Sequence, residues 1–154
     1  MADGVVTSVL ATPEFISRSR RLIDGATAPG AHTTISAFAI FAIADTVDEA
    51  RAAARPVVAE YLSHGANELT TAAGISDELT AMLADGGRER LINELPDSWI
   101  DRVSICGDGP TCRNRIEQLH DAGADEIALM PANSTDVINQ IRRTGSALRP
   151  ALLT

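Results

Sequence analysis

"TTISAFAIFAIADTVDEA", residues 33–50, decides the fold class of this chain. From Ala37 to Ala44 the stretch is apolar at odd and even positions alike, whereas a strand with one solvated face alternates. It therefore predicts a parallel strand that is covered on both faces. A helix is expected directly after it, because Thr46 and Glu49 have the spacing of a capping box. A buried strand that leads into a helix is typical of an α/β fold.

Two further strands flank this stretch. Residues 4–10 predict a strand before it, followed by a helix with Thr12 as N-cap and Pro13 at its first position. That helix is expected to end at Asp24-Gly25. Residues 125–131, "DEIALMP", predict the third strand.

A last helix is expected over residues 133–145, capped by Asn133 or Ser134 and ended by basic residues and Gly145. No turn between the predicted strands has the sequence of an antiparallel hairpin. The alternation of strands and helices therefore predicts right-handed βα units in a parallel sheet.

The region between the second and third strands predicts an irregular helical insertion. Pro56 lies within the helical pattern that starts at Thr46, so a kink or two consecutive helices are expected there. Residues 76–87 and 88–103 predict short helices on either side of Gly86-Gly87. A further helix is expected to start at Asp108 or Gly109 and to end at Gly123.

Composition limits the classes of function. The 154 residues predict one domain, 1–154, with 45% hydrophobic and 22% charged residues. A net charge of −8 argues against binding to nucleic acid or to an anionic membrane surface. No apolar run reaches the roughly 18 residues of a membrane span, and no secretory signal precedes the first strand. A cytoplasmic protein is expected.

The residue types that most often carry chemistry give weak signals. Cys106 and Cys112 are expected to be reduced, structural thiols, and the three histidines are too scattered for a metal site. The "GDGPT" turn, residues 107–111, precedes a helix, but an acid in that turn repels phosphate, so capping is the favoured role. Asp45 is interpreted as a turn or helix-entry residue.

Three segments together resemble one family. They are "ADGVVTSVLATPEF" (2–15), "EARAAARPVVAEYL" (49–62) and "LPDSWIDRVSICGDGPTCRNRIEQLHDAGADEIALMP" (95–131). In order and spacing they are similar to the C-terminal portion of luciferase-like monooxygenases, which include bacterial luciferase and reductases dependent on coenzyme F-420, a deazaflavin. One departure is the turn before Pro110, where the family commonly has threonine and this chain has Asp108-Gly109.

The resemblance implies part of a TIM (β/α)₈ barrel. The strands at residues 4, 33 and 126 would be the sixth, seventh and eighth, so the last three βα units and the helical insertion are present and five units are missing. Three parallel strands cannot close a barrel, and their edges would stay unpaired. Completion by oligomerisation is therefore expected, through a homodimer or a separately encoded N-terminal barrel half; refolded local segments are the other alternative.

The resemblance also implies a cofactor, FMN or coenzyme F-420, near the carboxyl ends of the strands. Thr7 and Ser8 stand at the end of the first strand and are the predicted cofactor contacts; the alternative is that they are ordinary strand and turn hydroxyls. No catalytic residue is assigned, because many such residues come from the missing units, and no metal is expected.

Three functions follow as hypotheses. The first is a flavin- or deazaflavin-dependent oxidoreductase or monooxygenase, of which this chain is a segment or subunit. The second is a non-catalytic, self-associating remnant of the fold, with a structural or small-molecule-binding role. The third is a small enzyme repurposed for non-redox chemistry.

Overall fold

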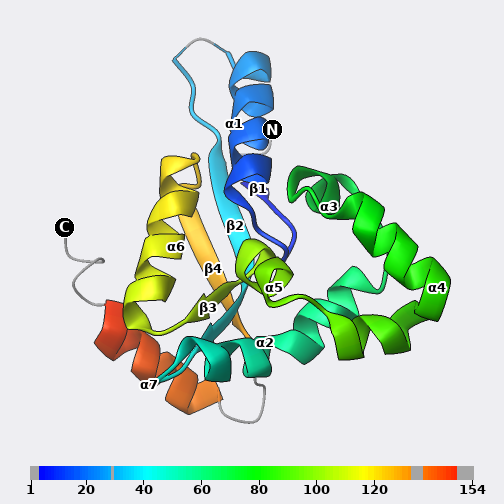
Figure 1. Cartoon of the computed structure of the whole chain (residues 1–154). Coiled ribbons are helices and arrows are strands. Elements are labelled where there is room, and N and C mark those ends of the chain that lie inside the picture. The colour runs from blue at the N-terminus through cyan, green and yellow to red at the C-terminus, as the bar shows by residue number, and fades with distance from the viewer. Residues whose placement is uncertain (1–3, 29, 133–136, 149–154) are drawn as a thin grey trace.

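An open sheet of parallel strands is built around one long strand, β2. The computed structural model describes residues 4–28, 30–132 and 137–148 (Figure 1). In chain order the elements are β1 (Gly4–Val6), α1 (Pro13–Ala26), β2 (Thr34–Ile43), α2 (Val47–Leu62), α3 (Glu68–Ala72), α4 (Ser76–Glu94), α5 (Asp97–Val103), β3 (Ile105–Gly107), α6 (Gly109–Asp121), β4 (Glu126–Pro131) and α7 (Val137–Leu148).

The two edges of β2 are paired differently. On one edge β2 pairs with β1 over residues 34–36 and with β3 over residues 41–43. On the other edge it pairs with β4 over residues 36–41. All three pairings are parallel. The predicted α/β class with a parallel sheet is confirmed, and the described sheet is not closed.

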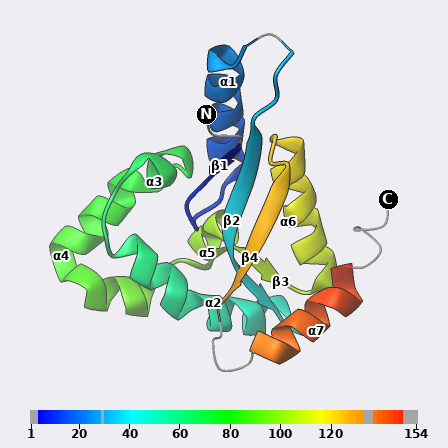
Figure 2. The ribbon, with the colours of Figure 1, turned by 180° about the vertical axis from the view of Figure 1, so that it is seen from behind.

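Both faces of β2 are covered from Ala39 to Ile43, as the unbroken apolar run predicts, whereas Ser36 and Phe38 are half-buried. Its odd-numbered residues, such as Phe41, lie in one apolar cluster with residues of α1, α6 and α7, such as Leu119. Ile40 and Ala42 face a second cluster built with α2, α4 and α5. We call these the odd face and the even face. Figure 2 shows α3 and α4 extending away from the sheet on the side opposite α6 and α7.

The strand β3 is a correction to the sequence-based expectation, which contained three strands. Ile105–Gly107 forms a fourth, short strand within the insertion, fully buried against the end of β2. Three residues are too few for a periodic pattern, and only the pairing with β2 defines the strand. The short helix α3 was likewise not predicted.

The insertion is helical, with one difference at Pro56. The helix α2 runs continuously through Pro56, so a division into two helices there is wrong. The carbonyl of Ala52 loses its usual partner at this point, but Ala52 lies on an exposed face where water can bind. Gly87 does interrupt the helical conformation inside α4, as expected, with φ of +59°.

Helix starts were predicted better than helix ends. Thr12 caps α1 by accepting a hydrogen bond from the Phe15 amide at 3.1 Å, and Thr46 and Glu49 form the expected capping box. The helix α1 ends at Ala26, two residues late, and α7 continues through Gly145 to Leu148. The predicted caps Asn133 and Ser134 lie outside the described residues.

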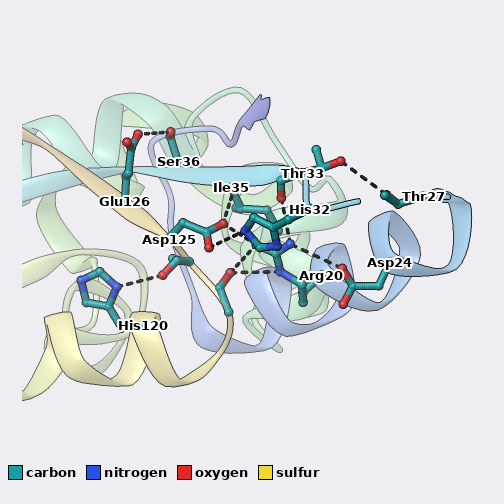
Figure 3. A network of polar contacts seen from close by, with 12 residues as sticks. Arg20, Asp24, Thr27, His32, Thr33, Ile35, Ser36, His120, Asp125 and Glu126 are labelled. Carbon is teal, nitrogen blue, oxygen red and sulfur yellow. Dashed lines mark hydrogen bonds and ion pairs between the residues drawn. The ribbon is translucent and has the colours of Figure 1, made fainter. Parts of the chain in front are cut away.

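A polar network ties the amino-terminal ends of the strands together (Figure 3). The Asp125 carboxylate accepts hydrogen bonds from the Ile35 amide at 2.7 Å, from Arg20, and from His32 at 2.9 Å. Arg20 also donates to the carbonyls of Thr33 and Gly123, both at 2.9 Å. In barrel-like folds this end serves stability, and the chemistry lies at the opposite end.

Candidate functional site

A cleft of about 490 Å³ lies at the carboxyl-terminal ends of β2 and β3. Ile43, Ala44 and Asp45 line it from the end of β2, and Asp108 and Gly109 line it from the end of β3. The helix α7 supplies the remaining wall with Arg142, Arg143, Ser146 and Ala147. Ligand sites in parallel α/β folds occur at this end of the strands, so we take this carboxyl-end cleft as the candidate site.

Side-chain contacts fix α7 across the end of the sheet. The side-chain oxygen of Gln140 accepts a hydrogen bond from the backbone N–H of Ile43 at 3.1 Å. The side-chain nitrogen of Gln140 donates to the Ile43 carbonyl at 3.3 Å. Arg113 of α6 donates to the Ala147 carbonyl at 2.7 Å. Gly109 also lies close to α7, because a Cβ there would come within 3.2 Å of Ala147. Contacts with β2 and with α6 therefore hold α7 in place as a wall of the cleft.

The cleft contains charges of both signs, and one of them is unpaired. Arg143 forms an ion pair with Asp45 at 2.8 Å. Asp108 accepts a hydrogen bond from the Thr111 amide at 2.9 Å, and bonding to Thr111 holds the pKa of this carboxyl below its usual value. The guanidinium of Arg142 has no hydrogen bond or ion pair with any other described residue, whereas its carbonyl accepts a hydrogen bond from Ser146 at 3.1 Å. The cleft therefore offers a guanidinium to an acidic group of a ligand.

Asp108 and Asp45 both lie where helices begin, as predicted, but only Asp45 also forms an ion pair. Asp108 caps α6, as its position in the "GDGPT" turn predicts. Asp45 directly precedes the N-cap of α2, and its carboxylate is also the partner of Arg143. The cleft lining described here contains no cysteine or histidine. Its lining does contain the hydroxyl of Ser146, which donates to the Arg142 carbonyl at 3.1 Å and has no histidine in the lining to activate it. The cleft can therefore bind and orient a polar ligand.

Thr7 and Ser8, the predicted cofactor contacts, do not line the carboxyl-end cleft. The Thr7 amide donates to the Ser36 carbonyl at 3.0 Å, so the two hydroxyls lie about halfway along β2. Thr7 is only 8% exposed, and its buried hydroxyl has no hydrogen-bond partner among the described residues. Ser8 is exposed. A role for either residue in cofactor binding stays a prediction.

Sequence reasoning missed Arg142 and Arg143. Both lie in the "NQIRRTG" segment, where basic residues are expected at the end of a helix for electrostatic reasons alone. Their placement depends on α7 crossing the end of β2, a long-range arrangement that no local motif encodes. The sequence contains one indication of this placement, which is that α7 follows β4, a strand that pairs with β2.

Neither cysteine has the surroundings of a nucleophile. Cys112 is fully buried, and burial raises the pKa of its thiol to about 12. Burial also raises the pKa of Cys106. His120 contacts the Ala124 carbonyl at 2.8 Å through Nδ1 and is not placed against either thiol. Both thiols are therefore protonated and unreactive at neutral pH.

The described residues contain neither a candidate metal site nor a candidate membrane-spanning helix. They contain no group of three or more histidine, cysteine, aspartate or glutamate side chains that could hold a metal ion. Nor does any helix in the described ranges have the length and apolarity required to cross a bilayer.

Comparison with known proteins gives the family. The family model for luciferase-like monooxygenases matches residues 1–126, and this chain belongs to that family. It is similar to the 5,10-methylenetetrahydromethanopterin reductase of Methanolobus tindarius, with 27% identity over an alignment of 135 residues that covers 82% of this chain and 41% of the relative.

A solved structure shows the same fold. The coenzyme F420 dependent tetrahydromethanopterin reductase from Methanopyrus kandleri superposes with a TM-score of 0.79 at 22% sequence identity, over 98% of this chain and 46% of that one. This chain therefore has the fold of part of a luciferase-like barrel. It spans less than half the length of both relatives.

Proposed function

We propose that this chain is part of an oxidoreductase of the luciferase-like family that uses a deazaflavin, coenzyme F420, rather than FMN. Family membership supports the class of enzyme, and the two similar reductases, one of them F420-dependent by name, favour the deazaflavin. The observation that carries the proposal for this chain's own residues is the carboxyl-end cleft, with the unpaired Arg142 on one wall. When bound, the deazaflavin supplies hydride transfer.

The polar groups present fit part of a cofactor site. The Thr7 hydroxyl is buried without a partner, which is costly unless another group completes the hydrogen bond. Arg142 can take an acidic group, and the Asp45–Arg143 ion pair fixes the charge beside it. In the carboxyl-end cleft, Arg142 and the Asp45–Arg143 pair would bind and orient the ligand, and Thr7, which lies outside the cleft lining, would be a separate contact. No described residue of this chain is assigned as the acid or base of the reaction.

We further propose that a second polypeptide completes the site, and that it is a separately encoded N-terminal half of the barrel. The strand β4 has β2 as its one neighbour in the described sheet, so its other edge is free to pair. The even face is incompletely covered near its amino-terminal end, where Val6 is 72% exposed and Phe38 is half-buried. The aligned relatives are more than twice as long, which favours this partner over a second copy of the chain.

Native mass spectrometry of the purified chain tests both parts of this proposal. The chain is measured alone, and then with added F420 or with added FMN. We expect a complex with a different polypeptide, and an added mass equal to F420 that FMN does not reproduce. A homodimer that binds neither cofactor would contradict the oxidoreductase proposal and would support the self-associating, non-catalytic alternative.

A further inference from the structure

A second cavity, of about 310 Å³, lies among the helices on the outside of β3. Its walls come from the first turn of α2, from α5, from β3 and from α6, and none of its lining residues lines the carboxyl-end cleft. The volume falls at the lower end of the roughly 300–1,000 Å³ that is usual for small-molecule sites. We call it the α5–α6 cavity.

One guanidinium in this cavity has no acidic partner. Arg115 donates to the Gln118 side-chain oxygen at 3.0 Å and to the Arg102 carbonyl, and its buried Nε has no partner among the described residues. No carboxylate in the described ranges forms an ion pair with it. Burial lowers the pKa of Arg115, because its charge has lost part of its hydration. Arg115 as a whole is half-buried, but its Nε–H is buried without an acceptor, and a ligand carboxylate would supply one.

Among the lining residues, the charges of Arg51 and Asp101 balance each other. The Arg51 guanidinium forms a bidentate ion pair with the Asp101 carboxylate, in which Nε donates to Oδ1 at 2.9 Å and Nη2 donates to Oδ2 at 2.6 Å. Asp48, in the first turn of α2, also contacts Arg51 at 3.1 Å. Cys106 lies 3.8 Å from Asp101, and the raised pKa of its thiol keeps it neutral. Arg115 is therefore the lining charge without a direct ion pair, although the carboxylates of Glu14 and Asp101 act on it from a distance.

The first turns of two helices also face this cavity. Val47 begins α2, which has 16 residues, and Thr111 lies in the first turn of α6, which has 13. The amino-terminal end of a helix carries a partial positive charge, which Asp48 and Glu49 in α2 and the Asp108 cap of α6 already offset in part. Side chains of Thr111, Asn114 and Gln118 add hydrogen-bonding groups to the wall, while Val47 and Cys106 make it partly apolar.

We propose that the α5–α6 cavity binds a small organic carboxylate. The carboxylate would pair with the Arg115 guanidinium, and the apolar part of the ligand would lie against Val47 and Cys106. This site is separate from the proposed cofactor cleft, and its occupancy does not depend on the redox function.

Titration with sodium acetate and sodium succinate tests this proposal, with inorganic phosphate as a second probe. The full chain is used in the assembly in which it purifies, and sodium chloride holds the ionic strength constant. We expect a saturable rise of the thermal unfolding midpoint with a carboxylate, together with a shift of the Arg115 Nε–Hε resonance in NMR spectra. Phosphate alone producing both effects would overturn the choice of a carboxylate.

Two variants and a control separate binding from folding. Asn114→Asp places a carboxylate on the exposed rim of the cavity without touching the contacts of Arg115, and should weaken the affinity at least tenfold. Arg115→Gln should abolish binding; if it fails to fold, Asn114→Asp still decides. Arg21→Gln, at an exposed arginine of α1 that lines neither cavity, should leave the affinity unchanged. Equal affinity in Asn114→Asp and the native chain, or no saturable effect of any probe, would overturn the proposal.

Discussion

At the scale of single residues, Asp125 carries the strongest prediction about stability. Burial raises the pKa of its carboxyl, but the hydrogen bonds that it accepts from a β2 amide and from two side chains outweigh burial and hold the pKa below its usual value. The native state therefore binds this proton less readily than the unfolded state does. The resulting stability is fully present above the unfolded pKa of about 3.9 and is lost as the pH falls through the lower, folded value.

Asp125→Asn should consequently lower the free energy of unfolding by about 1–2 kcal/mol at pH 7. The difference from the native chain should shrink in acid and vanish below the folded pKa. Urea denaturation at a series of pH values measures it, with Asp77→Asn on the exposed first turn of α4 as the control. A deficit that stayed constant down to pH 2 would show that the carboxylate charge is not its cause.

Arg142 carries the prediction about binding. If its guanidinium takes an acidic group of F420 in the carboxyl-end cleft, Arg142→Ala removes one charge-assisted contact worth about 1.5–3 kcal/mol. The dissociation constant for F420 should then rise roughly 10- to 100-fold. Fluorescence titration of the assembled protein measures it. Arg21→Ala is the matched control, because Arg21 is an arginine on α1 that contacts only Ser17. Unchanged affinity in Arg142→Ala would move the cofactor away from this cleft.

At the scale of elements, two glycines of the same half of the chain should respond to alanine in opposite directions. Gly107 ends β3 with φ of +150°, and an added Cβ would lie 2.7 Å from the Thr111 side chain. Gly107→Ala is therefore strained and crowded, and should cost about 1–3 kcal/mol. Gly145 lies inside α7 with no atom within 4 Å of an added Cβ, so Gly145→Ala should stabilise by about 0.4–1 kcal/mol. Thermal unfolding of the two variants measures both signs. Similar effects in both would mean that the turn after β3 is not rigid.

The elements also show which parts of the fold local sequence can predict. The capping box of Thr46 and Glu49 and the long strand β2 were predictable, because each depends on residues that are close together in sequence. The capping box of α3, with Asn67 as N-cap, was not predicted. The strand β3 was not, since Ile105–Gly107 becomes a strand only by pairing with the end of β2. The carboxyl-end cleft was not predicted from the sequence for the same reason. Arg142 and Asp45 are 97 residues apart in sequence, and only the crossing of α7 over β2 brings their surroundings together.

At the scale of the whole molecule, the proposed partner would cover two surfaces, which are the free edge of β4 and the incompletely covered part of the even face. An unpaired parallel strand and exposed apolar side chains beside it are liabilities unless another polypeptide covers them. Ala128 lies in the middle of β4, in register with Phe38 on the even face, and is exposed. In the chain alone a large charged side chain at this position would reach water. In an assembled barrel it would have to be buried without a partner.

Ala128→Arg should therefore leave the helical content of the chain unchanged but weaken its assembly by at least 100-fold, since burying an unpaired charge costs several kcal/mol. Ala52→Arg, on the exposed face of α2, is the control and should assemble normally. Sedimentation velocity over a concentration series measures the assembly, and circular dichroism measures the fold. If Ala128→Arg assembles as well as the native chain, the even face is not the interface, and the partner must bind along the helices instead.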